Sequence, residues 1–125
     1  MSRLFVIACM IFCHIVDDYY LQGILASMKQ RKWWEEHYPQ KSYNYDYIMA
    51  LAMHAMSWAF MIMLPVAAYM GFRPTNIFFV MLAVNSVIHA LVDDLKANKY
   101  KINLIVDQCI HMIQIVATAA ILLYL

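Results

Sequence analysis

Residues 76–96, NIFFVMLAVNSVIHALVDDLK, combine a long apolar run with ionisable residues inside it. A helix that crosses a bilayer needs about 20 mostly apolar residues, and this stretch has that length. Within it, His89 and Asp93 are four residues apart, which places both side chains on one face of a helix. Ionisable side chains are costly in hydrocarbon and usually mark a functional site. The segment therefore predicts both a transmembrane helix and part of a site.

Three further segments are long and apolar and also contain ionisable residues: 4–28, 47–70 and 102–125. Of the 125 residues, 65% are hydrophobic and only 14% are charged, whereas soluble domains carry about 25% charged residues. The first segment carries Asp17 and Asp18 and lacks a signal-peptide cleavage site, which favours a structural helix over a leader. We expect one integral membrane domain over residues 1–125.

The links between these segments are short. Residues 71–76 form a tight turn with Gly71 and Pro74, residues 97–101 form a basic link, and residues 29–46 form a polar loop rich in aromatic side chains. Short links make consecutive helices antiparallel neighbours. The predicted fold is all-α, a transmembrane four-helix bundle running up-down-up-down, with both termini on one side.

The basic residues predict the orientation of this bundle. One side holds the first and third links and seven of the basic residues: Lys29, Arg31, Lys32, Lys41, Lys96, Lys99 and Lys101. The side with the termini holds only Arg3 and Arg73. Because cytoplasmic loops carry the excess of Lys and Arg, loops 29–46 and 97–101 should be cytoplasmic and both termini should lie on the opposite side. The net charge of +1 argues against a nucleic-acid partner, which would need a concentrated basic surface.

A histidine and an aspartate four residues apart occur three times in the chain, once in residues 76–96. Which of the two comes first depends on the direction of the helix. The pairs are His14 with Asp18, His89 with Asp93, and Asp107 with His111. In the predicted topology, the order reverses where the helix reverses, so each aspartate lies nearer the cytoplasm and each histidine about 6 Å deeper. The second helix adds His54 near the same level.

This arrangement favours a metal centre over isolated hydrogen-bonded pairs, which remain the alternative. The predicted ligands are His14, Asp18, His54, His89, Asp93, Asp107 and His111. Imidazole and carboxylate suit zinc best here, with manganese or iron as alternatives, and the number of ligands leaves room for one or two ions. Gln22 and Gln108 should lie around these ligands and orient them. Lys96, at the rim, could hold an anionic group or simply extend to the membrane surface.

The ordered motifs HxxxD at His14, HxxxDxxK at His89 and DQxxH at Asp107 resemble a family of small bacterial and phage multi-pass membrane proteins of unknown function. That family is in turn similar to the membrane-bound metal-dependent hydrolases. The resemblance spans nearly the whole chain and implies a bacterial inner-membrane location. One position departs from it: a second histidine is expected four residues after His54, where this chain has Trp58.

The leading hypothesis is a metal-dependent hydrolase at the cytoplasmic membrane face. The ion would acidify a water molecule, Asp18 or Asp93 would accept its proton, and Lys96 would steady an anionic substrate. Membrane lipid and a small or lipid-linked substrate are the expected partners, with a homodimer as a further expectation. A proton or divalent-metal transporter is the first alternative, and a non-catalytic structural membrane protein is the second.

Overall fold

The computed structural model describes residues 1–125, and all of its regular elements are helices. The four long segments are α1 (Arg3–Val16) with the π-helical turn η1 (Asp17–Leu21), α4 (Asp46–Tyr69), α5 (Asn76–Ala97) and α6 (Leu104–Tyr124). Three short helices lie between the first two segments: α2 (Leu25–Met28), α3 (Arg31–His37) and η2 (Lys41–Tyr43). Each long segment is long and apolar enough to cross a membrane. The predicted all-α four-helix bundle is confirmed.

Local sequence sets where these helices begin and end. The side chain of Ser2 accepts a hydrogen bond from the Phe5 amide before α1, and Asn103 accepts one from the Val106 amide before α6. Such caps satisfy amides that have no partner within the helix. After α4, Gly71 adopts a φ of 64°, a left-handed conformation that glycine adopts without strain. The chain therefore reverses there and enters α5.

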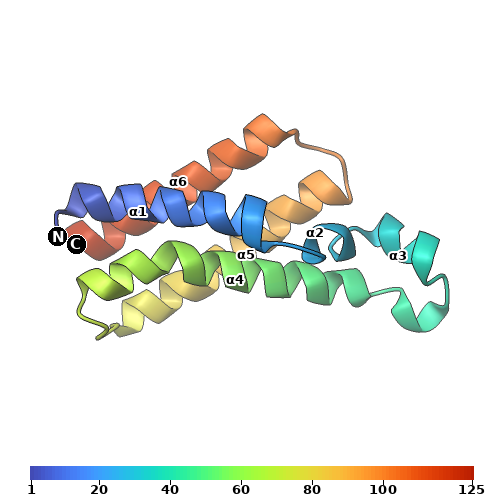
Figure 1. Cartoon of the computed structure of the whole chain (residues 1–125), viewed down its shortest axis with the longest axis horizontal. Helices are drawn as coiled ribbons and strands as arrows, with labels where there is room; N and C mark the ends of the chain where they lie inside the picture. The colour runs from blue at the N-terminus through green and yellow to red at the C-terminus, as the bar shows by residue number, and fades with distance from the viewer.

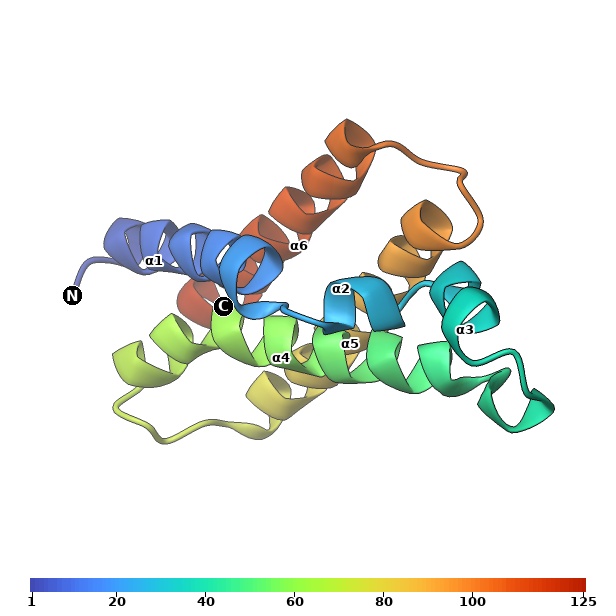
Figure 2. The ribbon, with the colours of Figure 1, turned by 45° about the vertical axis from the view of Figure 1, so that its right-hand side comes forward.

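The four long helices pack in a ring. Helix α1 contacts α4 and α6, and α5 contacts the same two helices from the other side. Figure 1 shows both termini at one end together with the α4–α5 link, whereas the other links lie at the opposite end. Figure 2 shows α5 and α6 both rising away from α4 toward the link that joins them. The helices therefore run alternately up and down, as predicted.

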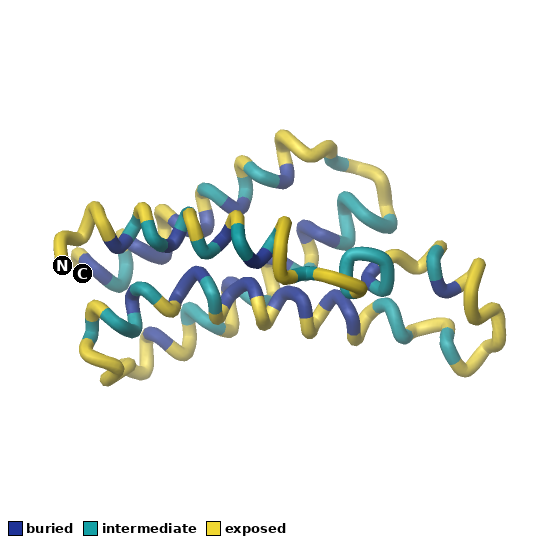
Figure 3. The backbone as a smooth tube through the Cα atoms, in the orientation of Figure 1, coloured by how far each residue is buried: buried dark blue, intermediate teal, exposed yellow.

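Apolar side chains cover the outside of the bundle and polar side chains lie inside it, the reverse of a soluble protein. Large apolar side chains are exposed along the outer faces, including Phe12, Phe60, Leu91 and Val116. Histidines, aspartates and amides are buried inside, and Figure 3 shows the buried residues along the inward side of each long helix. An apolar exterior suits contact with lipid tails, since nothing in hydrocarbon can solvate polar groups.

The interior divides into two parts along the bundle axis. The end nearest the termini is filled by apolar side chains, here called the apolar half: Val6, Met10, Trp58, Ala59, Ile62, Met63, Val66, Phe78, Ile115, Ala119 and Leu123. The end nearest the α5–α6 link contains the ionisable residues, here called the polar half: His14, Asp17, Asp18, His54, His89, Asp93, Asp107 and His111. Trp58 lies where the two halves meet, because it belongs to the apolar cluster and also contacts three histidines of the polar half.

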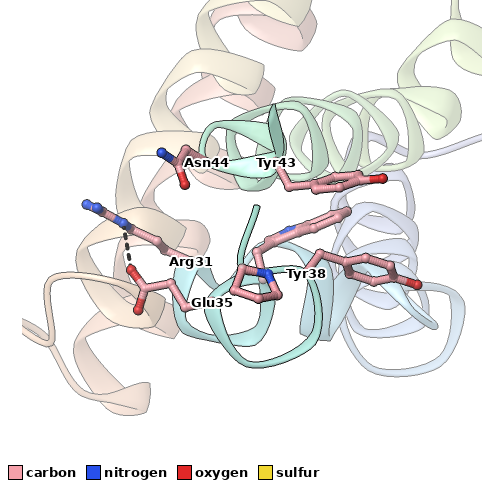
Figure 4. A pocket seen from close by; sticks show the side chains of 7 residues that line it. Arg31, Glu35, Tyr38, Tyr43 and Asn44 are labelled. Carbon is pink, nitrogen blue, oxygen red and sulfur yellow. Dashed lines mark hydrogen bonds and ion pairs between the residues drawn. The ribbon is translucent and has the colours of Figure 1, made fainter. Parts of the chain in front are cut away.

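The first transmembrane helix is shorter than the predicted 4–28. It ends at Leu21, and Gly23, with a φ of 55°, turns the chain into the short helix α2. The following segment, expected to be a loop, instead folds into α3 and η2. Its aromatic rings pack on one another, and Figure 4 shows Tyr38 and Tyr43 beside the ion pair of Arg31 with Glu35. The orientation of this end toward the cytoplasm stays a prediction.

Candidate metal centre

Four side-chain atoms from three helices converge in the polar half. The Nε2 atom of His54 lies 3.1 Å from His89 Nε2, 3.2 Å from Asp18 Oδ1 and 3.4 Å from Asp93 Oδ2. The Nε2 atom of His89 lies 3.7 Å from each of the same two carboxylate oxygens. All four side chains are at least nine-tenths buried. Residues that are far apart in the sequence therefore bring two carboxylate oxygens close to the same two imidazole nitrogens.

These separations fit a metal ion. Zinc binds histidine nitrogen and carboxylate oxygen at about 2.0–2.2 Å, so the ligand atoms of a tetrahedral site lie about 3.3–3.6 Å from one another. The five distances above range from 3.1 to 3.7 Å and bracket that value. The buried His and Asp side chains could hold a metal ion, as predicted.

A second set of ionisable atoms adjoins the first. The Nε2 atom of His111 lies 3.3 Å from Asp107 Oδ1 and 3.8 Å from Asp93 Oδ1. These three atoms are buried and have no hydrogen-bond partner. His89, Asp93 and His111 form a second group in which ligand atoms lie close enough for a shared ion. His89 therefore belongs to both groups, and Asp93 also approaches the first group, since its Oδ2 atom lies 3.4 Å from His54 Nε2.

The charges of the polar half do not cancel. Four buried carboxylates, those of Asp17, Asp18, Asp93 and Asp107, face only two ammonium groups. Lys29 Nζ lies 2.7 Å from Asp93 Oδ2, and Lys96 Nζ lies 2.7 Å from Asp107 Oδ2. With neutral histidines, two negative charges remain without a partner. Buried charges are normally paired or bound to metal, so a divalent cation would balance this cluster.

The π-helical turn η1 brings two consecutive aspartates into the interior. The side chains of Asp17 and Asp18 are both buried, whereas neighbours in an α-helix point about 100° apart. A π-helical turn is wider, and such turns occur often at functional sites. Asp17 accepts a hydrogen bond from Ser57, and its other oxygen lies 3.9 Å from His54 Nδ1. Asp17 therefore links the first helical segment to α4.

His14 lies beside the converging atoms, but both of its ring nitrogens are engaged elsewhere. Its Nδ1 atom accepts a hydrogen bond from the indole of Trp58, so its Nε2 atom donates to Gln108 Oε1. Gln108 in turn donates to Asp107, and more weakly to Asp18. His14 therefore has no lone pair left for an ion in this structure. It orients Gln108, which holds two predicted ligands.

Trp58, at the position where the resemblance leads one to expect histidine, is part of the same arrangement. Its ring stacks on His89, with centroids 4.2 Å apart and an angle of 19° between the planes. The side chain is fully buried. Trp58 therefore fixes the orientation of His89 and the tautomer of His14 together.

Lys29 also belongs to the site, because it pairs with Asp93. The sequence predicts it only as a basic residue of the loop. Its side chain enters the bundle because the chain turns back after Gly23. The side chain of Asn98 then holds the segment, by donating to the Lys29 carbonyl and accepting from the Arg31 amide. The only signal in the sequence is Gly23, a residue that often interrupts helices.

The remaining predicted residues lie at the edge of the centre. Lys96 is partly exposed, with 27% of its side chain accessible, and Gln22 donates to the carbonyl of Asp18 in its own helix. Gln22 therefore does not contact a predicted ligand side chain, whereas Gln108 contacts two. His37, in α3, is exposed and takes no part.

A polar network continues from His111 toward the apolar half. His111 Nδ1 lies 3.0 Å from Gln114 Oε1, Gln114 donates to the carbonyl and side-chain oxygens of Asn85, and Asn85 donates to Thr118. Beyond Thr118 the interior is apolar. The polar path therefore stops inside the bundle.

Comparison with known proteins gives no relative for this chain: no family model, no curated protein and no solved structure matches it.

Proposed function

We propose that this chain is a membrane-embedded, metal-dependent hydrolase that acts at the cytoplasmic face of a bacterial inner membrane. The observation that carries the proposal is the meeting of His54 Nε2 and His89 Nε2, 3.1 Å apart, with one oxygen each of Asp18 and Asp93 at 3.2 to 3.7 Å from these nitrogens. A set of two nitrogens and two oxygens favours zinc, with manganese or iron as alternatives. A lipid-linked or phosphate-bearing substrate suits a centre that lies at one end of a membrane bundle.

The bound ion would supply Lewis acidity and acidify a water molecule. The protein's own residues would do the rest. The Oδ2 atom of Asp18 lies away from the converging atoms and receives only a weak hydrogen bond of 3.4 Å from Gln108, which leaves it able to accept a proton. Lys96, partly exposed at the rim, would stabilise negative charge on a substrate.

The proposal is tested with purified protein in liposomes, loaded with zinc, manganese or ferrous iron. The substrates are phosphatidic acid, a lysophospholipid and a polyprenyl diphosphate, and release of phosphate or fatty acid is measured by mass spectrometry. We expect metal-dependent turnover of at least one of them, abolished by Asp93→Asn. The matched control is Asp94→Asn, because Asp94 is the neighbouring aspartate but pairs with Lys99 and Asn98, outside the metal centre. Metal-loaded protein that hydrolyses none of them would contradict the proposal.

Divalent-metal or proton transport is the second candidate, and the network from His111 to Thr118 is the observation that favours it. Transport needs a polar path across the whole membrane, whereas this network ends at the apolar half. Hydrolysis at a site near one end of the bundle therefore fits better. Liposomes containing a divalent-ion or pH indicator distinguish the two, since a transporter produces flux and a hydrolase does not.

A further inference from the structure

We propose that the centre holds two divalent ions bridged by Asp93, and that the second ion binds together with a doubly charged anion such as phosphate. This inference rests on the proposed metal-dependent function and names the class of substrate for it. The first position is the one formed by Asp18, His54 and His89. The second lies between Asp107 and His111.

Asp93 has the geometry of a bridging ligand. Its Oδ2 atom faces the first position, 3.4 Å from His54 Nε2 and 3.7 Å from His89 Nε2. Its Oδ1 atom faces the second position, 3.8 Å from His111 Nε2. One carboxylate that presents its two oxygens to two ligand sets is the arrangement that holds pairs of ions about 3.5–4 Å apart in two-metal enzymes.

The hydrogen-bond network beyond His111 points a nitrogen lone pair into the second position. Asn85 donates to Thr118, and Gln114 uses its NH₂ group to donate to Asn85. The Oε1 atom of Gln114 is therefore the acceptor that faces His111, so Nδ1 of His111 carries the proton and donates. In the neutral ring, the Nε2 atom then has a lone pair and no proton. A histidine that ligates metal is usually held in this way through its other nitrogen.

That lone pair faces two carboxylate oxygens. Nε2 of His111 lies 3.3 Å from Asp107 Oδ1 and 3.8 Å from Asp93 Oδ1, and all three atoms are buried without a hydrogen-bond partner. A buried polar atom without a partner is costly, and three acceptors facing one another repel. A cation between them removes both penalties. The competing explanation is an imidazolium at His111, which would leave no room for the second ion.

The charge of the cluster indicates when the second ion binds. One divalent ion balances the two negative charges left by four carboxylates and two lysines. A second ion leaves two positive charges, which are costly in a membrane. A phosphate dianion supplies the complementary charge, and Lys96 at the rim lies on the same side as Asp107. Binding of the second ion and of phosphate should therefore strengthen each other.

The test is a titration of the purified full-length protein with Mn²⁺, with and without inorganic phosphate, followed by electron paramagnetic resonance and elemental analysis. We expect one ion per chain without phosphate and two with it, with a spectrum of two exchange-coupled ions in the second case. One uncoupled ion under both conditions would overturn the two-ion inference and leave the proposed function standing. No bound ion would overturn both.

Two variants locate the second position. His111→Gln can still donate to Gln114 but loses the ring nitrogen, so phosphate should no longer raise the stoichiometry above one, while the first ion stays. His37→Gln, in the exposed segment, is the matched control and should behave as the unmodified protein. If His111→Gln still binds two coupled ions with phosphate, His111 is not a ligand and the inference is wrong. The measurement on the unmodified protein does not depend on how well either variant folds.

Discussion

The polar and apolar halves of this bundle are built from the same four helices but are held together differently. In the apolar half, side chains such as Ile62, Met63 and Ile115 are fully buried and interlock. Lipid is as apolar as these residues, so packing rather than exclusion of water stabilises this half. In the polar half, hydrogen bonds and ion pairs join the helices, and several buried atoms have no partner. The apolar half therefore has the packing of a bundle core, whereas the polar half contains buried groups without partners, which lower stability.

Of the changes that affect only one half, Asp93→Asn in the polar half should have the largest effect, a loss of zinc affinity. Asparagine keeps the shape but loses the charge and one oxygen ligand, and it leaves Lys29 with no ion-pair partner. Removing a charged ligand that faces both positions should weaken zinc binding at least about 1,000-fold, which is about 4 kcal/mol. Isothermal titration with Zn²⁺ measures this, with Asp94→Asn as the control that should bind normally. An affinity within tenfold of the unmodified protein would show that Asp93 is not a ligand.

In the apolar half, Ile62→Ala should lower stability without changing the metal stoichiometry. The side chain is fully buried, and the cavity left behind should cost about 2–3 kcal/mol. Thermal unfolding in detergent measures the loss, and elemental analysis measures the metal. Phe60→Ala, in the same helix but on the exposed side, is the matched control with little effect. Loss of metal in the folded Ile62 variant would mean that the two halves are not independent.

Lys29→Met should strengthen metal binding. Lys29 Nζ is 2.7 Å from the Asp93 oxygen that faces the first position, so its removal makes the cluster more negative by one charge. We expect about tenfold tighter Zn²⁺ binding, equivalent to about 1.4 kcal/mol, together with lower stability of the metal-free protein. Lys32→Met, which is exposed, is the control. Weaker binding in the Lys29 variant would mean that the lysine supports the ligand set rather than competing with the ion.

The smallest effect is expected from His14→Gln. The amide can accept from Trp58 and donate to Gln108, as the imidazole does here. The Kd for Zn²⁺ should therefore change by less than about threefold, whereas His54→Gln should raise it at least about 100-fold. If both variants lost the same affinity for Zn²⁺, His14 would be a metal ligand, as the sequence predicts.

The sequence was informative wherever helical spacing alone decides position. Four apolar segments predict the bundle, and the common depth of the His and Asp pairs and of His54 predicts that these residues meet. It was less informative where tertiary contacts decide. The entry of Lys29 depends on the turn after Gly23, and the engagement of His14 depends on the indole of Trp58. The π-helical turn that buries both Asp17 and Asp18 likewise leaves no periodic signal.

The most direct test of a metal centre is X-ray absorption at the zinc edge on protein loaded with Zn²⁺. We predict stoichiometric zinc surrounded by nitrogen and oxygen at about 2.0–2.1 Å, with the outer scattering of imidazole rings, and loss of this signal in Asp93→Asn. Protein that retains no zinc, or zinc without imidazole among its ligands, would contradict the account.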